Sequence, residues 1–254
     1  MSEKKTSLNP SLKPEEPQGL KEQVKAWIKD FIDVIVTLGV ILIILRVLLG
    51  AQMIVPLVVI TTGSMVHHAG DYSWMEWLNS HGIAYERISE MPLGNGFNVG
   101  DMMVTMRPDV KLGDVIIYER DFVYGKAGME PIIHRVVGIV QVNNNTVAGF
   151  EGTLDCFKEE DFSTFIQYVE DCRSRQKECN YPKVPETDPY RFYITKGDAN
   201  SASDQCATYG NTPMRIALPV NEAQVPAKAW LRLPYIGWLK LILNALIRLL
   251  TLRF

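Results

Sequence analysis

The longest apolar stretch of the chain lies near its N-terminus. Residues 31–50 are apolar except for Asp33, Thr37 and Arg46. Twenty residues at about 1.5 Å of rise per residue form a helix that crosses the roughly 30 Å hydrocarbon layer of a bilayer. A cleaved signal peptide is the alternative, but the stretch is too long for one and lacks a clean cleavage site. We therefore expect a retained anchor, and three lysines ahead of it place the N-terminus in the cytoplasm.

After this span, the pattern changes to short apolar runs that are separated by turn residues. Residues 54–60 are mostly β-branched and apolar, and they predict a strand that runs into Thr61-Thr62-Gly63-Ser64-Met65. Glycine- and asparagine-containing turns separate five further predicted strands, which are 101–106, 114–119, 132–141, 145–150 and 191–195. The fold class that this pattern predicts is mainly β, an antiparallel β-sheet or partial barrel between an N-terminal transmembrane helix and a C-terminal apolar helix.

Two segments of the expected domain, 66–100 and 151–190, are interpreted as insertions. The first is rich in Trp, His, Gly and Pro, and the membrane surface is one candidate position for it. The second is charged, holds three of the four cysteines and permits one short helix around 157–171. Helix signals elsewhere in this part of the chain are weak, so the strands are expected to dominate.

The last segment, 230–254, is again apolar and basic. Lys240, Asn244 and Arg248 recur every four residues and so share one face of a helix. This pattern suits a helix in the membrane interface, and a second membrane span is the open alternative. The predicted organisation is a cytoplasmic tail 1–30, an anchor 31–50, an extracytoplasmic β-rich domain 51–229 and a membrane-associated helix 230–254.

The distribution of charge agrees with this organisation. Residues 1–30 carry six lysines against five acids, and residues 228–254 carry five basic residues and no acid. Residues 31–227 hold 15 basic and 24 acidic groups, a net charge of −9. An acidic body does not favour nucleic acid, whose binding depends on clustered Lys and Arg, whereas basic ends suit a lipid bilayer.

The four cysteines all follow the apolar span, at positions 156, 172, 179 and 206. No CxxC pair is present, which argues against a zinc knuckle or a redox motif. Outside the cell one or two disulfides would form, with three connectivities open for two bonds, while buried thiols are the alternative.

Three separated motifs supply a serine, a histidine and an acid. Ser64 follows the first predicted strand, His134 lies in an otherwise apolar strand, and Asp204 follows a polar loop. A hydroxyl becomes a nucleophile when an imidazole takes its proton, and a carboxylate orients the imidazole. Gly63 would leave backbone amides free for an oxyanion, and the Thr62 hydroxyl could assist them.

Other residues compete for these roles. His67 and His68 are alternative bases, although side chains next to Ser64 on a strand point to opposite faces. Lys196 is a rival base of the Ser–Lys type, but its place before Gly197 predicts an exposed side chain. Asp198 is either a second catalytic acid or a turn residue that binds nearby amides. The histidines lack the spacing of a metal motif, so we expect no metal and no other cofactor.

These motifs, taken in order, resemble type I signal peptidase of the archaeal and endoplasmic-reticulum branch. The resemblance covers about residues 30–240 and includes Thr62-Gly63-Ser64-Met65, Gly113-Asp114-Val115-Ile116, Ile133-His134-Arg135 and Gly197-Asp198-Ala199-Asn200 with Asp204. It implies a membrane-anchored serine endopeptidase that removes signal peptides from exported preproteins. Ser64 matches the nucleophile, His134 the base, and Asp204 and Asp198 the two acids of this branch.

The resemblance also implies partners and a location. The partners are the signal peptides of secreted preproteins and the lipid bilayer, with the secretion translocon as a further candidate. The location is the cell membrane, with the catalytic domain outside. The chain departs from the family where a proline often stands two residues after Met65, since His67 occupies that position. A non-catalytic, membrane-tethered binding domain is the alternative function.

Overall fold

The computed structural model of the chain describes residues 19–50, 52–53, 55–68, 72–126, 128–174, 178–209 and 212–251. It divides into two compact units, residues 1–44 and 45–254, and each is described by itself. Helix α1, Leu20–Leu49, begins in the first unit and is one continuous helix of 30 residues. Among the described residues, it is the helix with the length and composition to cross a membrane, so the predicted apolar helix is confirmed. Most of the predicted tail, residues 1–18, lies outside the described residues.

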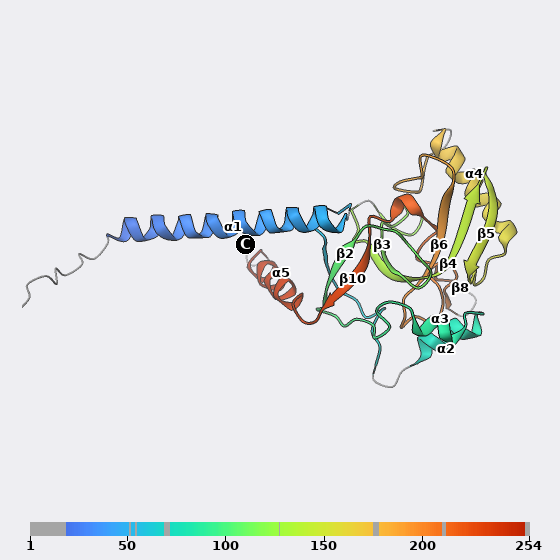
Figure 1. Cartoon of the computed structure of the whole chain (residues 1–254), viewed down its shortest axis with the longest axis horizontal. Coiled ribbons are helices and arrows are strands. Elements are labelled where there is room, and N and C mark those ends of the chain that lie inside the picture. Colours follow the sequence, from blue (N-terminus) through green and yellow to red (C-terminus); the bar gives the residue numbers. More distant parts are fainter. Residues whose placement is uncertain are drawn as a thin grey trace, which may run out of the picture. The chain divides into compact units, whose positions relative to one another are not determined.

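The second unit is built around an antiparallel sheet of eight strands that curls into a half-barrel (Figure 1). Seven strands follow one another in the order β1-β2-β10-β3-β4-β6-β9, and β5 pairs with β4 beside this path. The predicted antiparallel sheet is therefore confirmed, although helix accounts for about 33% of the chain and strand for about 22%. The strands of the sheet are β1 (Leu57–Val59), β2 (Met102–Met106), β3 (Val115–Tyr118), β4 (Ile132–Asn143), β5 (Thr146–Gly152), β6 (Tyr190–Lys196), β9 (Val220–Asn221) and β10 (Ala227–Leu233).

Strand β4 is the longest strand of the sheet, and it pairs with three other strands, β3, β5 and β6. On one edge its first residues pair with β3 and its later residues pair with β5. On the other edge, pairing with β6 begins only at Arg135, opposite Lys196. The segment Ile132–His134 therefore has one edge that no described strand covers. This gap in the sheet holds the histidine of the predicted triad.

Strand β3 separates two hydrophobic clusters. Its four residues are all buried, and alternate residues of a strand point to opposite faces of a sheet. Ile116 and Tyr118 pack in the larger cluster with β4, β6 and the helices, whereas Val115 and Ile117 pack in a smaller cluster with Met65. Apolar burial contributes about 25 cal/mol per Å² to stability, so both clusters hold the sheet in its curled form.

Two short helices lie within residues 66–100, the segment that the sequence analysis interprets as an insertion. Helix α2, Ser73–Ser80, and helix α3, Tyr85–Ser89, bury Trp74, Leu78 and Ile88 in the larger cluster. Trp74 and Leu78 are four residues apart, so they share one face of α2. Helices α2 and α3 are thus part of the domain core, because their apolar side chains gain more from burial in protein than from exposure.

The 151–190 segment contains the expected short helix. It also contributes at least one cysteine to each of the two disulfide bonds. Helix α4, Phe162–Arg173, buries Phe162, Ile166 and Val169, whose spacing places them on one face. It follows a 3-10 turn, Glu159–Asp161, and contacts β5. Disulfides join Cys156 to Cys206 and Cys172 to Cys179, so the question of pairing that the sequence left open is resolved.

The predicted C-terminal helix is shorter than its sequence pattern suggested. Residues 230–233 belong to β10, whose backbone pairs with β2 and β3, and helix α5 covers Trp238–Thr251. The helix begins against Gly100, whose φ of +87° allows its backbone to lie directly under the Trp238 indole. A second 3-10 turn, Glu222–Gln224, precedes β10, and the small strands β7 (Thr208–Tyr209) and β8 (Thr212–Pro213) form a separate hairpin.

We expect substitution of two glycines on neighbouring strands to have unequal effects. A Cβ on Gly138 of β4 would lie 2.0 Å from the carbonyl oxygen of Thr153, whereas a Cβ on Gly149 of β5 would meet no atom within 4 Å. Gly138→Ala should therefore lower the free energy of unfolding by about 1–3 kcal/mol, as overpacking does, and Gly149→Ala should not. Chemical denaturation in detergent would measure both variants. Equal stabilities would contradict the packing described for β4.

Candidate active site

The predicted nucleophile lies in a turn that is held from two sides. Ser64 follows β1 and is half-buried, and the next residue, Met65, is only 1% exposed. The carbonyl oxygen of Ser64 accepts a hydrogen bond of 2.8 Å from the amide of Ala199. The amide of Phe97 donates to the carbonyl oxygen of Met65 at 2.9 Å. The serine is thus fixed against the loop that precedes Asp204, far away in sequence.

His134 connects the serine to the acid. Its Nε2 lies 2.8 Å from the Ser64 hydroxyl oxygen, and its Nδ1 lies 2.7 Å from Oδ2 of Asp204. An ionised carboxylate only accepts hydrogen bonds, so the proton of a neutral imidazole resides on Nδ1 and Nε2 is free to accept. The structure therefore brings the three residues of the predicted triad together, with the imidazole in the form that a general base requires.

The Asp204 carboxylate is buried, and a single oxygen accepts three hydrogen bonds. Besides His134, the hydroxyls of Tyr118 and Thr195 donate to Oδ2 at 2.8 and 2.7 Å. Burial, followed by the charge of Asp204, raises the pKa of Tyr118 well above its usual value, so this hydroxyl keeps its proton and stays a donor. Such donors offset the cost of burying a charge. Tyr118 and Thr195 were not singled out from sequence, because both look like ordinary strand residues.

Gly197 allows the catalytic groups to approach one another. A Cβ at this position would lie 2.9 Å from Nε2 of His134 and 2.8 Å from the carbonyl oxygen of Ser64. Any side chain would therefore push the imidazole away from the serine. By contrast, a Cβ on Gly63 would meet only a Val66 methyl group at 3.9 Å, so the protein itself leaves room for a side chain there.

Asp198 is neither next to the imidazole of His134 nor a simple turn residue. Its two oxygens accept hydrogen bonds of 2.8 and 2.7 Å from the Arg135 guanidinium, and Oδ2 lies 2.9 Å from Nε2 of His67. Burial alone would raise the pKa of Asp198, but Arg135 and His67 together outweigh it and lower the value to about 2. This arrangement positions the loop. It also occupies Nε2 of His67, whose ring is stacked on Trp74, so His67 is not the base for Ser64.

Lys196 is buried, contrary to the exposed position expected from sequence. Its side chain is 2% exposed, and its ammonium donates to the carbonyl oxygens of Gly197 and Asp198 and lies 5.0 Å from the Trp77 ring centre. Burial lowers its pKa to about 8. The expectation failed because the residue ends β6 at a place where Trp77 of α2 lies against its ammonium group. The hydroxyl of Ser64 faces His134 instead, and His68 is exposed.

An open cleft of about 450 Å³ contains the serine and the histidine. Its walls include the outer edge of β1 and the uncovered segment Ile132–His134 of β4. Two strand edges with free backbone groups face one cleft, and such edges bind extended peptides by adding a strand. The Thr62 hydroxyl lies at the same place, 3.5 Å from the Ser64 hydroxyl, where it could donate to a developing oxyanion.

The described residues contain no group of three or more His, Cys, Asp or Glu side chains that could hold a metal ion. Comparisons with models of protein families, with curated proteins and with solved structures find no match for this chain.

We expect the buried pair of Arg135 and Asp198 to be strongly coupled in stability. Asp198→Asn would leave a guanidinium that is 0% exposed without its counter-ion, which typically costs about 3–5 kcal/mol. Arg135→Met would lose the same pair and its bonds to backbone carbonyls. A double-mutant cycle of the two changes, followed by denaturation, should give a coupling of about 1–3 kcal/mol. Additive effects would contradict the pairing.

Lys196 should give the protein a recognisable stability change at alkaline pH. Its folded pKa, about 8, lies below the ordinary value of 10.5, so the unfolded chain binds more protons between these two values. Stability should therefore rise with pH across this window relative to Lys196→Met, which cannot titrate. Thermal unfolding of both proteins in detergent at several pH values would measure this. A constant difference between them would mean that the lysine is not desolvated.

Proposed function

We propose that this chain is a membrane-anchored serine endopeptidase that removes signal peptides from exported preproteins. The observation that carries the proposal is the position of His134, within hydrogen-bond distance of both Ser64 and Asp204 beside an open cleft. Acyl transfer by a serine needs a base that takes the hydroxyl proton and a nucleophile that the substrate can reach, and this arrangement supplies both. The sequence resemblance to type I signal peptidase specifies the class of substrate.

The proposed reaction begins when the Ser64 oxygen attacks the carbonyl carbon of the scissile bond and His134 Nε2 takes the hydroxyl proton. Thr62 and nearby amides stabilise the oxyanion, and one such donor is typically worth about 3–4 kcal/mol. His134 then gives the proton to the departing amine as the carbon–nitrogen bond breaks. Water, deprotonated by His134, hydrolyses the acyl-enzyme, and Asp204 stabilises the imidazolium at each transfer.

The proposed substrate binds in extended form along the two strand edges of the cleft. Main-chain hydrogen bonds would provide affinity, and shallow pockets would select small side chains near the cut. Helix α1 would hold the enzyme in the same bilayer as the substrate's apolar segment, which raises their effective concentration. The secretion translocon is a candidate partner because it delivers such substrates.

We place the catalytic domain outside the cytoplasm, with the N-terminus inside. Two disulfides in the domain support this orientation, because such bonds persist in oxidising compartments. The lysines before the apolar helix support it as well. Helix α5 joins the membrane-associated part, since its apolar side chains, among them Leu239, Ile242 and Leu246, are exposed.

The function is tested by cleavage of a preprotein by the purified full chain, with mass spectrometry of the products. Wild type should cut after small residues, and Ser64→Ala and His134→Ala should not cut. Asp204→Asn should lower kcat by about 10⁴-fold, as the loss of the orienting acid does in other triads.

The same assay separates the proposal from its alternatives. Lys196→Met should keep measurable activity, because the hydroxyl of Ser64 is bonded to His134. Loss of all activity in Lys196→Met with activity retained in His134→Ala would point to a Ser–Lys protease. A wild type that binds preproteins and does not cut them would favour a binding domain.

A further inference from the structure

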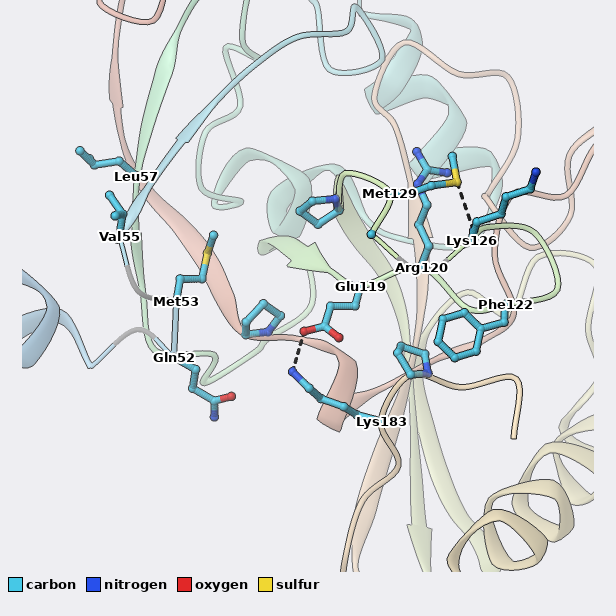
Figure 2. A pocket seen from close by; sticks show the side chains of 14 residues that line it. Gln52, Met53, Val55, Leu57, Glu119, Arg120, Phe122, Lys126, Met129 and Lys183 are labelled. Carbon is cyan, nitrogen blue, oxygen red and sulfur yellow. Dashed lines mark hydrogen bonds and ion pairs between the residues drawn. The ribbon is translucent and has the colours of Figure 1, made fainter. Parts of the chain in front are cut away.

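A second and larger cavity, of about 870 Å³, adjoins the catalytic cleft. Figure 2 shows it between the segment from Gln52 to Leu57 and the loop that follows β3. The cavity and the cleft share four lining residues, Met53, Leu57, Arg120 and Pro131. The two hollows are therefore neighbours, with Ser64 in the cleft and Gln52 in the cavity near the start of β1.

The wall of the cavity is held by specific contacts. The buried carboxylate of Asp121 accepts two amide hydrogen bonds from its own loop, at 3.0 Å each, and one from Leu218 at 2.8 Å. The amide of Phe122, which lines the cavity, donates to the carbonyl oxygen of Asn180 at 2.6 Å. Asn180 follows the disulfide Cys172–Cys179 by one residue. The 151–190 insertion thus supports this wall, and it contributes Lys183 to the lining.

The lining is largely apolar with an excess of positive charge. Met53, Leu57 and Met129 provide apolar surface. Lys183 is paired with Glu119 at 2.6 Å, as the dashed line in Figure 2 indicates, whereas no ion pair of Arg120 or Lys126 is recorded among the described residues. A cationic side chain placed here would lose water and meet like charge, so the cavity discriminates against it.

The order of residues along the chain indicates which of the two hollows an arriving substrate would meet first. Gln52, at the cavity, follows the last residue of α1, Leu49, by only three positions, and its amide donates to the carbonyl oxygen of Pro226. Three residues span at most about 11 Å. A substrate held by its own apolar helix leaves the bilayer at the same surface. Its chain therefore reaches the cavity before it reaches Ser64.

We infer that this cavity is an upstream subsite, which binds uncharged or apolar side chains between the substrate's membrane segment and its scissile bond and rejects basic ones. The inference rests on the proposed function. The substrate would run in the same direction as β1, with its backbone along the free strand edge. Leu57 precedes Ser64 by seven residues, and the chain turns after β1, so seven positions before the cut is the upper limit for the subsite.

The test uses synthetic peptides in lipid bicelles with the full-length protein. Each peptide has a leucine-rich membrane segment, a variable residue six positions before the cut, small residues at the cut and a fluorescent polar tail. Binding is measured on the Ser64→Ala variant, which separates affinity from chemistry. We expect Lys at the variable position to bind at least about tenfold more weakly than Leu.

Charge reversal at the cavity supplies the specific control. Lys126→Glu, in the Ser64→Ala background, should reduce the discrimination against Lys to about threefold or less, because one of the like charges becomes an attractive one. Lys158→Glu changes an equally exposed lysine of the insertion that does not line the cavity, and it should keep the original discrimination. In the active enzyme Lys126→Glu should reduce the difference in kcat/KM between the Lys and Leu peptides by the same factor, whereas Lys158→Glu should leave that difference unaltered.

The outcomes distinguish this inference from the proposed function. Equal binding of Lys and Leu peptides, or equal effects of Lys126→Glu and Lys158→Glu, would overturn the subsite while cleavage by wild type still supports the peptidase. Discrimination in binding with no cleavage by wild type would support the subsite as a peptide site and overturn the peptidase. Absence of binding by every peptide would overturn both.

Discussion

The arrangement of the catalytic groups depends on one buried carboxylate. Asp204 lies among strands where an unpaired charge would cost several kcal/mol, so its Oδ2 must be matched by donors. Tyr118 and Thr195 supply two of them from neighbouring strands, and His134 supplies the third. Because the imidazole is fixed by its Nδ1, its other nitrogen has to face outward, where Ser64 lies. The hydrogen bond from His134 to Oδ2 therefore both offsets part of the cost of burying the charge and orients the base.

A second buried charge network holds the other side of the site. Arg135 follows His134 in β4, and its guanidinium binds Asp198, in the loop whose Ala199 amide binds the carbonyl oxygen of Ser64. Adjacent residues on a strand point to opposite faces, so one strand serves both networks without competition between them. This explains why two aspartates six residues apart in one loop have different tasks. Asp204 orients the imidazole, whereas Asp198 positions the loop.

The same sheet that carries these networks also leaves its edges open. Strand β4 gains its β6 partner only at Arg135, and β1 is an end strand of the sheet. Exposed strand edges often promote aggregation. Here they line the catalytic cleft, which adjoins the larger cavity. Polar backbone groups that the fold leaves without partners are thus available to an extended peptide. The open strand edges of this sheet are therefore the feature that the proposed binding of an extended substrate requires.

The sequence by itself determined the apolar helix, most strands and the identity of the serine, histidine and acid, because these follow from local periodicity and residue chemistry. Only the tertiary structure decided that Asp198 pairs with Arg135, that Lys196 is buried, and that α2 belongs to the core. These depend on contacts between segments far apart in sequence, and hydrophobic periodicity gives the face of a strand without naming its neighbour. The pattern of 230–254 likewise suited a helix throughout, yet residues 230–233 continue β10 because the free edge of β2 accepts their backbone.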